Sequence, residues 1–246
     1  MDQIFRASPK LRKKTMKPIL ILGSLLIAAN ANADFLGLTA EVGSFSPDAD
    51  LWAADTNTTG TSDMDADSGT YYGIAFEHPI PLIPNVRLQG TELTADGTAT
   101  ATYNGTSYTD ANAEIDLSHT DYTLYYEFLD GLLWLSLDAG ITLRQYDGYV
   151  EISNDRTDIS ETIPMAYIAP YIDIPGTGLS IGGELKYLSY DDSSITDTTI
   201  KLKWESPFLV GIEAGYRQHE IDLVDIADLD VYSDNSGVFI GVNIDI

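Results

Sequence analysis

From Asp34 to the C-terminus, apolar residues recur at every second position, and no stretch sustains a helical period. The clearest case is 133–144, where Leu, Ala and Ile alternate with Trp, Ser, Asp, Gly, Thr and Arg. Ten segments share the alternation: 36–43, 71–77, 86–89, 121–128, 133–144, 162–174, 179–187, 199–205, 208–217 and 238–246. The pattern predicts an all-β fold with ten strands. It predicts eight if 162–174 is not a strand, because Pro170 lacks the N–H that a central strand uses.

The connections between these segments alternate in length. The short connections are 79–85, 129–132, 175–178 and 205–207. The longer, polar connections are 46–69, 96–112, 147–161, 191–197 and 223–229. A soluble β-sandwich or lipocalin-like barrel has no reason to sort its loops in this way. An outer-membrane barrel has short periplasmic turns and long outer loops, so the sorting predicts a ten-stranded antiparallel transmembrane barrel.

The second face of each segment carries the charge. These residues are Arg87, Glu127, Asp138, Arg144, Glu184, Lys186, Lys201, Lys203, Glu213 and Arg217. Such side chains are costly in hydrocarbon but suit a polar lumen, where acids and bases can pair. The inward faces also carry large side chains: Tyr125, Trp134, Tyr167, Tyr171, Arg144 and Lys203. Because small barrels are usually filled by side chains, we expect a plugged bore.

Aromatic residues form two sets along the chain. The set beside the short connections is Phe76, Phe128, Trp134, Tyr171, Trp204 and Phe208. The set near the long connections is Tyr72, Tyr122, Tyr146, Tyr187, Tyr190 and Tyr216. Aromatic rings prefer the depth of the lipid headgroups, so the two sets predict a belt at each membrane interface.

The N-terminal 33 residues have the pattern of a signal peptide. A basic stretch precedes the apolar run Ile19–Ala29, and Ala31-Asn32-Ala33 offers small residues at a cleavage site. We expect cleavage after Ala33, with residues 34–246 forming the barrel in a bacterial outer membrane. Met16 begins a compact signal of its own, so either Met1 or Met16 is the start of translation.

The composition narrows the classes of function. Residues 1–33 hold six of the 13 Lys and Arg and one of the 38 acids, so the remainder has 7 bases, 37 acids and a net charge of −30. A chain with this charge repels nucleic acid. The absence of Cys excludes disulfides, thiolate metal sites and thiol catalysis.

Two parts of the chain carry a family resemblance. The segments His119–Glu127 and Leu135–Ile141 resemble a small family of uncharacterised outer-membrane β-barrel proteins of Gram-negative bacteria. Gly215-Tyr216-Arg217 and Ser236–Gly241 resemble the C-terminal part of the same family. The resemblance implies an outer-membrane barrel and no particular activity. Barrels of this kind usually have an aromatic residue at the last position, which the assembly machinery recognises, and this sequence has Ile246 there.

The sharpest local motif is Asp63-x-Asp65-x-Asp67-Ser-Gly69. Acids two apart on a turning loop can direct hard oxygens at Ca²⁺, so we expect Asp63, Asp65 and Asp67 to form a weak metal site. The match to an EF-hand loop is partial, because Ser68 occupies the sixth place and Ile74 the twelfth. The alternative is an acidic loop that stays hydrated or associates loosely with divalent ions and lipopolysaccharide phosphates. No other cofactor is expected.

Three functions remain open. The first is a non-enzymatic structural or surface-interaction protein with acidic outer loops, in contact with outer-membrane lipid, lipopolysaccharide, the barrel assembly machinery and an unknown external ligand. The second is a narrow channel for small solutes. The third is a rim hydrolase with His119 or His219 as general base, near Asp121 and Asp222. Ser118 and His119 cannot form a dyad, because neighbours in a strand point to opposite faces. We expect no enzyme.

Overall fold

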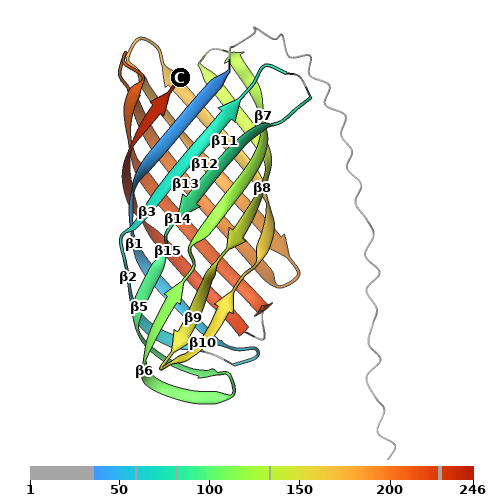
Figure 1. Ribbon diagram of the computed structural model, residues 1–246, viewed down its shortest axis with the longest axis vertical. Coiled ribbons are helices and arrows are strands. Elements are labelled where there is room, and N and C mark those ends of the chain that lie inside the picture. The colour runs from blue at the N-terminus through green and yellow to red at the C-terminus, as the bar shows by residue number, and fades with distance from the viewer. Residues whose placement is uncertain (1–35, 59, 81, 133, 227–228) are drawn as a thin grey trace, which may run out of the picture. The chain divides into compact units, whose positions relative to one another are not determined.

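The computed structural model describes residues 36–246 except 59, 81, 133 and 227–228. Strands and turns account for this part of the chain (Figure 1). No helix in the described part is long and apolar enough to cross a membrane.

Ten strands close into an antiparallel barrel, which confirms the predicted fold and strand count. Their order around the barrel is β1, β15, β14, β13, β12, β11, β8, β7, β4, β3. Their bounds are β1 Gly37–Asp55, β3 Gly69–Glu77, β4 Asn85–Thr91, β7 His119–Leu132, β8 Leu135–Tyr146, β11 Thr162–Ile174, β12 Leu179–Tyr190, β13 Ser193–Glu205, β14 Val210–Ile226 and β15 Leu229–Asp245. β1 closes the barrel by pairing with β15 from Thr39↔Asp245 to Asp55↔Leu229.

Pro170 lies inside β11, which is paired on both sides. The ladder with β8 is continuous through Pro170↔Leu137. The ladder with β12 lapses between Ile168↔Leu185 and Tyr171↔Gly182 and resumes in the same register. The barrel therefore accommodates the missing N–H as a local gap in one ladder.

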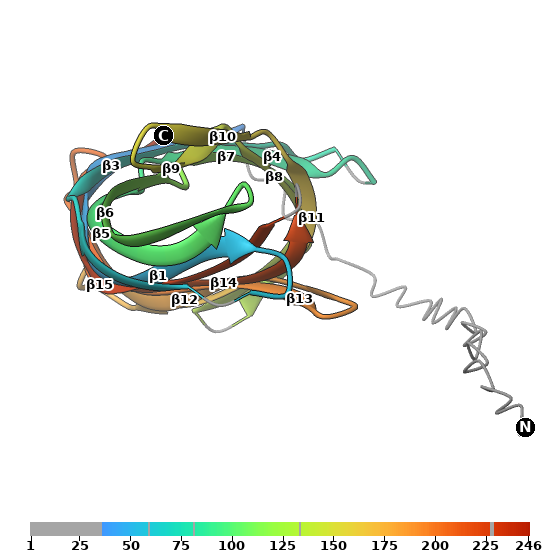
Figure 2. The same cartoon turned by 90° about the horizontal axis from the view of Figure 1, so that it is seen from below.

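The segments predicted as long polar loops consist mostly of strands in the described residues. The outer parts of β1, β13, β14 and β15 enter 46–69, 191–197 and 223–229, and a second sheet with the order β10, β9, β6, β5, β2 enters 96–112, 147–161 and part of 46–69. Its strands are β2 Thr61–Ala66, β5 Thr94–Tyr103, β6 Thr106–Asp116, β9 Gly148–Ile152 and β10 Asp155–Ile159. Each continues a barrel strand after a short break, at 67–68, 92–93, 117–118, 147 or 160–161. We call this sheet, together with the outer parts of β1 and β12–β15, the cap. Seen from the cap end, β5 and β6 lie across the barrel opening (Figure 2).

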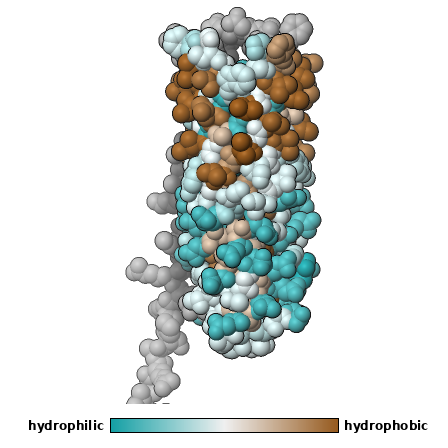
Figure 3. Space-filling model, turned by 90° about the vertical axis from the view of Figure 1, so that its left-hand side faces the viewer, coloured by the Kyte–Doolittle hydropathy of each residue, from teal (hydrophilic) through white to brown (hydrophobic). Residues whose placement is uncertain are grey.

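The polarity of the wall reverses between the barrel and the cap. In β14, Ile212 and Tyr216 face outward and Arg217 faces inward, whereas farther along Glu220 faces outward and Ile221 is fully buried. The alternation keeps its phase, so each strand passes from a lipid environment with a polar interior to water with an apolar interior. Figure 3 shows the result as an apolar band above a polar cap. The prediction of loops failed because polar residues in these segments suggest a loop, whereas here they form the water-facing side of strands.

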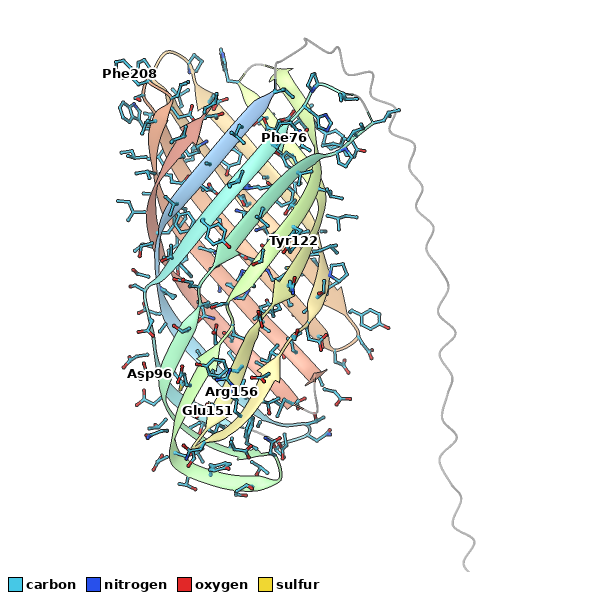
Figure 4. All side chains as sticks on the ribbon, viewed as in Figure 1. Phe76, Asp96, Tyr122, Glu151, Arg156 and Phe208 are labelled. Carbon is cyan, nitrogen blue, oxygen red and sulfur yellow. The ribbon has the colours of Figure 1, made fainter. Side chains whose placement is uncertain are left out.

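The apolar band contains outward residues from all ten barrel strands. Examples are Leu38, Val42, Ile74, Val86, Leu124, Ile141, Ile168, Ile181, Leu202, Ile212, Ile240 and Val242. Phe76 and Phe208 lie at its short-turn end and Tyr122 at its other edge, while Asp96, Glu151 and Arg156 lie in the cap (Figure 4). Two aromatic assignments are wrong, because Tyr171 lines the lumen and Tyr146 is buried.

The cap has its own apolar core. The core includes Phe45, Leu51, Met64, Leu93, Tyr103, Ile115, Val150, Ile152, Ile195, Ile221, Leu229 and Val231. It fills the space that an open outer mouth would occupy.

Candidate functional site: a charge-balanced plug

The middle of the lumen holds ten ionisable side chains from seven strands, which we call the plug. They are the acids Glu41, Asp121, Glu184, Asp197 and Glu213 and the bases Arg87, Arg144, Lys186, Lys201 and Arg217. Each side chain points inward because the residues before and after it in the strand belong to the apolar face that points outward. The formal charges cancel, which is what burial of so many ions requires.

The layer of the plug nearer the cap is a chain of five ions. Arg144 binds Asp121 through Nε–Oδ1 and Nη2–Oδ2, both at 2.7 Å. Its Nη2 also donates to Asp197 Oδ2 at 2.6 Å. Arg217 Nη2 reaches the same oxygen at 2.6 Å, and Lys186 Nζ lies 2.7 Å from Asp121 Oδ2. Arg144 is fully buried within this layer.

The second layer lies nearer the short turns. Arg87 bridges Glu41 Oε1 at 2.7 Å and Glu184 Oε1 at 3.0 Å. Lys201 Nζ lies 2.9 Å from Glu41 Oε2 and 3.3 Å from Glu213 Oε2. The carboxylates are thus shared between cations, which cross-links five strands.

Uncharged side chains connect and complete the two layers. Gln89 accepts a hydrogen bond from Lys186 at 2.8 Å and donates to Glu41 at 3.3 Å. Tyr71 donates to Glu213 at 2.6 Å, and Tyr171 donates to Glu184 at 3.2 Å. A cavity of about 40 Å³ adjoins both layers. It has room for a few water molecules and not for a hydrated ion or an organic solute.

His119 and His219 stack against each other on the cap side of the plug. Their ring centroids are 5.2 Å apart, with 19° between the planes, and both are buried. His119 Nδ1 donates to Leu117 O at 2.9 Å, and Arg217 Nη2 lies 3.4 Å from its Nε2. The stack lies beyond Tyr122 and Tyr216, outside the apolar band. Burial, with the nearby Arg144 guanidinium, lowers the pKa of His119 well below its usual value and that of His219 to about 3.

His119, Asp197 and His219 bring three candidate ligand atoms within 4.8 Å of one another. This arrangement does not suit a cation. Asp197 already accepts hydrogen bonds from Arg144 and from two nitrogens of Arg217. A divalent ion here would add charge beside two buried guanidinium groups.

The histidines also lack the surroundings expected for a rim base. Asp121 pairs with Arg144 and Lys186, and Asp222 is exposed on the outer surface of β14. The expected proximity of Asp222 to His219 is wrong. Asp222 follows His219 by three positions in β14, and residues an odd number of positions apart on a strand point to opposite faces. Ser118 and His119 diverge as expected, with Ser118 Oγ accepting from Leu93 N at 3.1 Å.

The motif residues Asp63, Asp65 and Asp67 lie on the outer surface of the cap. Asp63 and Asp65 are exposed on β2, and Asp67 follows its end and accepts a hydrogen bond from Thr94 at 3.2 Å. The expectation of a turning loop is wrong for 61–66. Same-face neighbours on a strand stand about 6.6 Å apart and do not converge. Calcium binding by these residues stays a prediction.

Sequence reasoning found the inward bases but not the partners that make them a plug. Six of the seven bases after residue 33 face the lumen, as expected, and Arg156 lies in the cap. The predicted charged face omits Asp121, Asp197 and Glu41, although alternation places them on the same faces. Trp134 is wrong as a lumen residue, since it lies at the β7–β8 turn with φ 72° and is 59% exposed.

Comparison with known proteins shows the fold. No family model and no curated protein match the chain. The outer-membrane protease OmpT from Escherichia coli superposes with a TM-score of 0.56 over 85% of this chain and 97% of OmpT, at 9% identity. The chain is an outer-membrane β-barrel.

Two other solved barrels match less closely. The transport unit of the autotransporter AIDA-I from Escherichia coli has a TM-score of 0.43 and 10% identity, with 89% of this chain and 93% of that chain covered. The outer membrane protein OprG from Pseudomonas aeruginosa has a TM-score of 0.34 and 11% identity, with 87% and 97% covered. The closed barrel and its apolar band place this chain in a bacterial outer membrane.

Proposed function

We propose that this barrel is a non-enzymatic protein of the cell surface, which holds a rigid acidic cap outside the membrane for interaction with other molecules. The observation that carries the proposal is the double closure of the lumen. The plug closes the middle of the lumen with paired ions, and the cap fills the outer part with apolar side chains.

The exterior of the cap supports a role in surface interaction. Outward positions there are rich in acids, among them Asp48, Asp50, Asp63, Asp65, Asp96, Glu114, Glu220, Asp222 and Asp234. Arg156, the base outside the lumen, already pairs with Asp158 at 2.8 Å. Partners in this proposal are cationic molecules outside the cell and, through divalent cations, lipopolysaccharide phosphates. Lipid contacts the apolar band, and the assembly machinery acts on β15.

The surroundings of the histidines favour the non-enzymatic proposal over a hydrolase. A general base must reach the proton that it removes, directly or through one water. His119 is 5% exposed and His219 is 0% exposed, and the apolar core of the cap lies above them. A substrate at the outer rim would not reach either ring.

Planar-bilayer recording tests the proposal against the channel alternative. We expect no conductance steps from the refolded chain, provided that heat-dependent gel migration shows the inserted protein to be folded. Discrete steps from folded protein would refute the sealed lumen and favour a narrow channel. For the cap, we expect vesicles that carry the protein to bind polylysine in a salt-sensitive manner.

Replacing Asp48, Asp50, Glu220 and Asp234 with their amides should weaken this polylysine binding. The matched control replaces four lumen-side carboxylates near the short turns, Glu77, Asp138, Asp173 and Asp245, and should leave it unchanged. Equal binding by the cap variant and the unmodified chain would refute the role of the cap.

A further inference from the structure

The lumen is hollow at the short-turn end. A cavity of about 480 Å³ lies between the plug and the short turns, and we call it the cup. It is hollow because inward positions near this end are small: Thr39, Gly73, Ala75, Ser136 and Ser180 line it. The volume is in the range of ordinary small-molecule sites. In an outer-membrane barrel the short turns face the periplasm, so the cup opens there.

The floor of the cup is built from fixed side chains. Tyr125 is 2% exposed, and its hydroxyl donates to Glu77 Oε1 at 2.8 Å. Tyr171 is held by its hydrogen bond to Glu184, and Arg87 by its ion pair with Glu41. The cup is therefore blind, with two aromatic rings among the residues that line it.

The wall of the cup has an excess of negative charge that the plug does not have. Beyond the plug residues, it carries the acids Glu77, Asp138, Asp173, Glu205 and Asp245 and the base Lys203. Lys203 Nζ lies 3.1 Å from Glu205 Oε1. A concave site of one charge sign with low-dielectric walls concentrates ions of the opposite sign. The cup thus favours a cation.

The spacing of the acids favours an extended cation over a metal ion. A metal ion needs several ligand atoms close together. Within the described residues, His119, Asp197 and His219 are the group of three that brings ligand atoms within 4.8 Å of one another, and this group lies outside the cup. The acids of the cup are thus spread around its wall and do not converge on one point. Ammonium groups on a flexible body can reach separate carboxylates, and its methylenes can lie against tyrosine rings.

We propose that the cup is a binding site for small aliphatic amines with two or more ammonium groups, which enter from the periplasm. The ammonium groups pair with Asp173, Asp245 and Glu77. The hydrocarbon body lies over Tyr125 and Tyr171. The site is separate from the acidic cap, and it does not require the lumen to conduct.

Calorimetry on the refolded protein in zwitterionic detergent tests the site, with spermidine as the probe. We expect saturable binding with one site per chain. The variant Asp173→Asn/Asp245→Asn should weaken it tenfold or more, since it removes two of the carboxylates that attract the ammonium groups. The matched control Asp63→Asn/Asp65→Asn removes the same charge from the cap and should bind as the unmodified chain does. Ser136→Phe narrows the cup without changing its charge and should weaken binding.

Several results would overturn the site. These are no saturable binding, equal weakening by the cup and cap variants, and unchanged binding by folded Ser136→Phe. Mg²⁺ that binds as tightly as spermidine and displaces it would show an inorganic ion site instead.

Carbodiimide coupling of spermidine to the unmodified chain tests the site without any variant. The carbodiimide activates a carboxylate, and an amine of bound spermidine displaces the urea and forms an amide, so at low spermidine concentration Asp173 and Asp245 should be coupled in preference to Asp63 and Asp65. Equal coupling at the two pairs would overturn the proposal even where the variants fail to fold.

Discussion

Replacement of Arg144 is the sharpest test of the plug. Its side chain is 0% exposed and makes two bonds to Asp121 and one to Asp197, at 2.6 to 2.7 Å. Arg144→Met keeps most of the volume and leaves five acids facing four bases. Removal of one partner from a buried ion pair costs about 3–5 kcal/mol. We expect about 3 kcal/mol here, because Asp121 keeps Lys186 and Asp197 keeps Arg217.

A double-mutant cycle separates charge imbalance from lost packing. Asp121→Asn combined with Arg144→Met restores four acids and four bases, and Lys186 keeps its bond to Gln89. The double variant should therefore be more stable than the sum of the single effects by about 1–3 kcal/mol. Arg156→Met is the matched control. Its side chain is 47% exposed, and we expect no measurable change.

The assay is reversible urea unfolding of the barrel in lipid vesicles, followed by tryptophan fluorescence. The reasoning is refuted if Arg144→Met unfolds at the same urea concentration as Arg156→Met. It is also refuted if the effects of Arg144→Met and Asp121→Asn simply add. Either result would mean that water enters the plug and solvates its ions.

Three further predictions concern other parts of the chain. The pKa of His219, lowered to about 3, lies below the value of about 6.5 for an unfolded histidine, so the unfolded state binds the extra proton. The contribution of His219 to stability should thus be full above pH 6.5 and fall by about 1.4 kcal/mol per pH unit from there to pH 5. In urea titrations, His219→Phe should remove this part of the slope and leave the part that comes from His119. Ile221→Asp should open the cap to added protease while the barrel keeps its heat-dependent migration, whereas Glu220→Ala on the outer surface of the same strand should change neither. Ile246→Phe should speed assembly in cells, measured by pulse-chase; an unchanged rate would show that assembly does not depend on an aromatic residue at position 246.

The barrel could be predicted from the sequence because its strands obey one rule throughout. Every membrane strand has apolar side chains facing lipid, so a period of two is visible without knowledge of the neighbours. Even Pro170 did not break the pattern, because the loss of one ladder contact is local. The cap strands follow the same period with the opposite polarity, and small residues such as Ala99 and Ala113 form much of their buried face. The alternation in the cap strands is therefore weak, and their sequence resembles that of a polar loop.

The plug could be predicted only in part, for a geometric reason. Asp121 and Arg144 lie directly opposite in the β7–β8 hairpin, so the short turn alone could have suggested this pair. Contacts across the lumen, such as Arg144 with Asp197, depend on the tilt and stagger of all ten strands. The period of a single strand contains no information about that stagger.

The sorting of charge along the barrel explains how so acidic a chain can hold five buried cations. Within the plug, acids and bases are equal in number, because unpaired ions at that depth are costly. The net charge of −30 after residue 33 therefore has to lie at the two aqueous ends, on the exterior of the cap and around the cup. Because most of the Lys and Arg residues after residue 33 lie in the lumen, the outer surface has few positive charges to neutralise its own acids or the phosphates of lipopolysaccharide. Close contact between that surface and an anionic membrane thus requires cations from solution, whereas a cationic partner meets no such barrier.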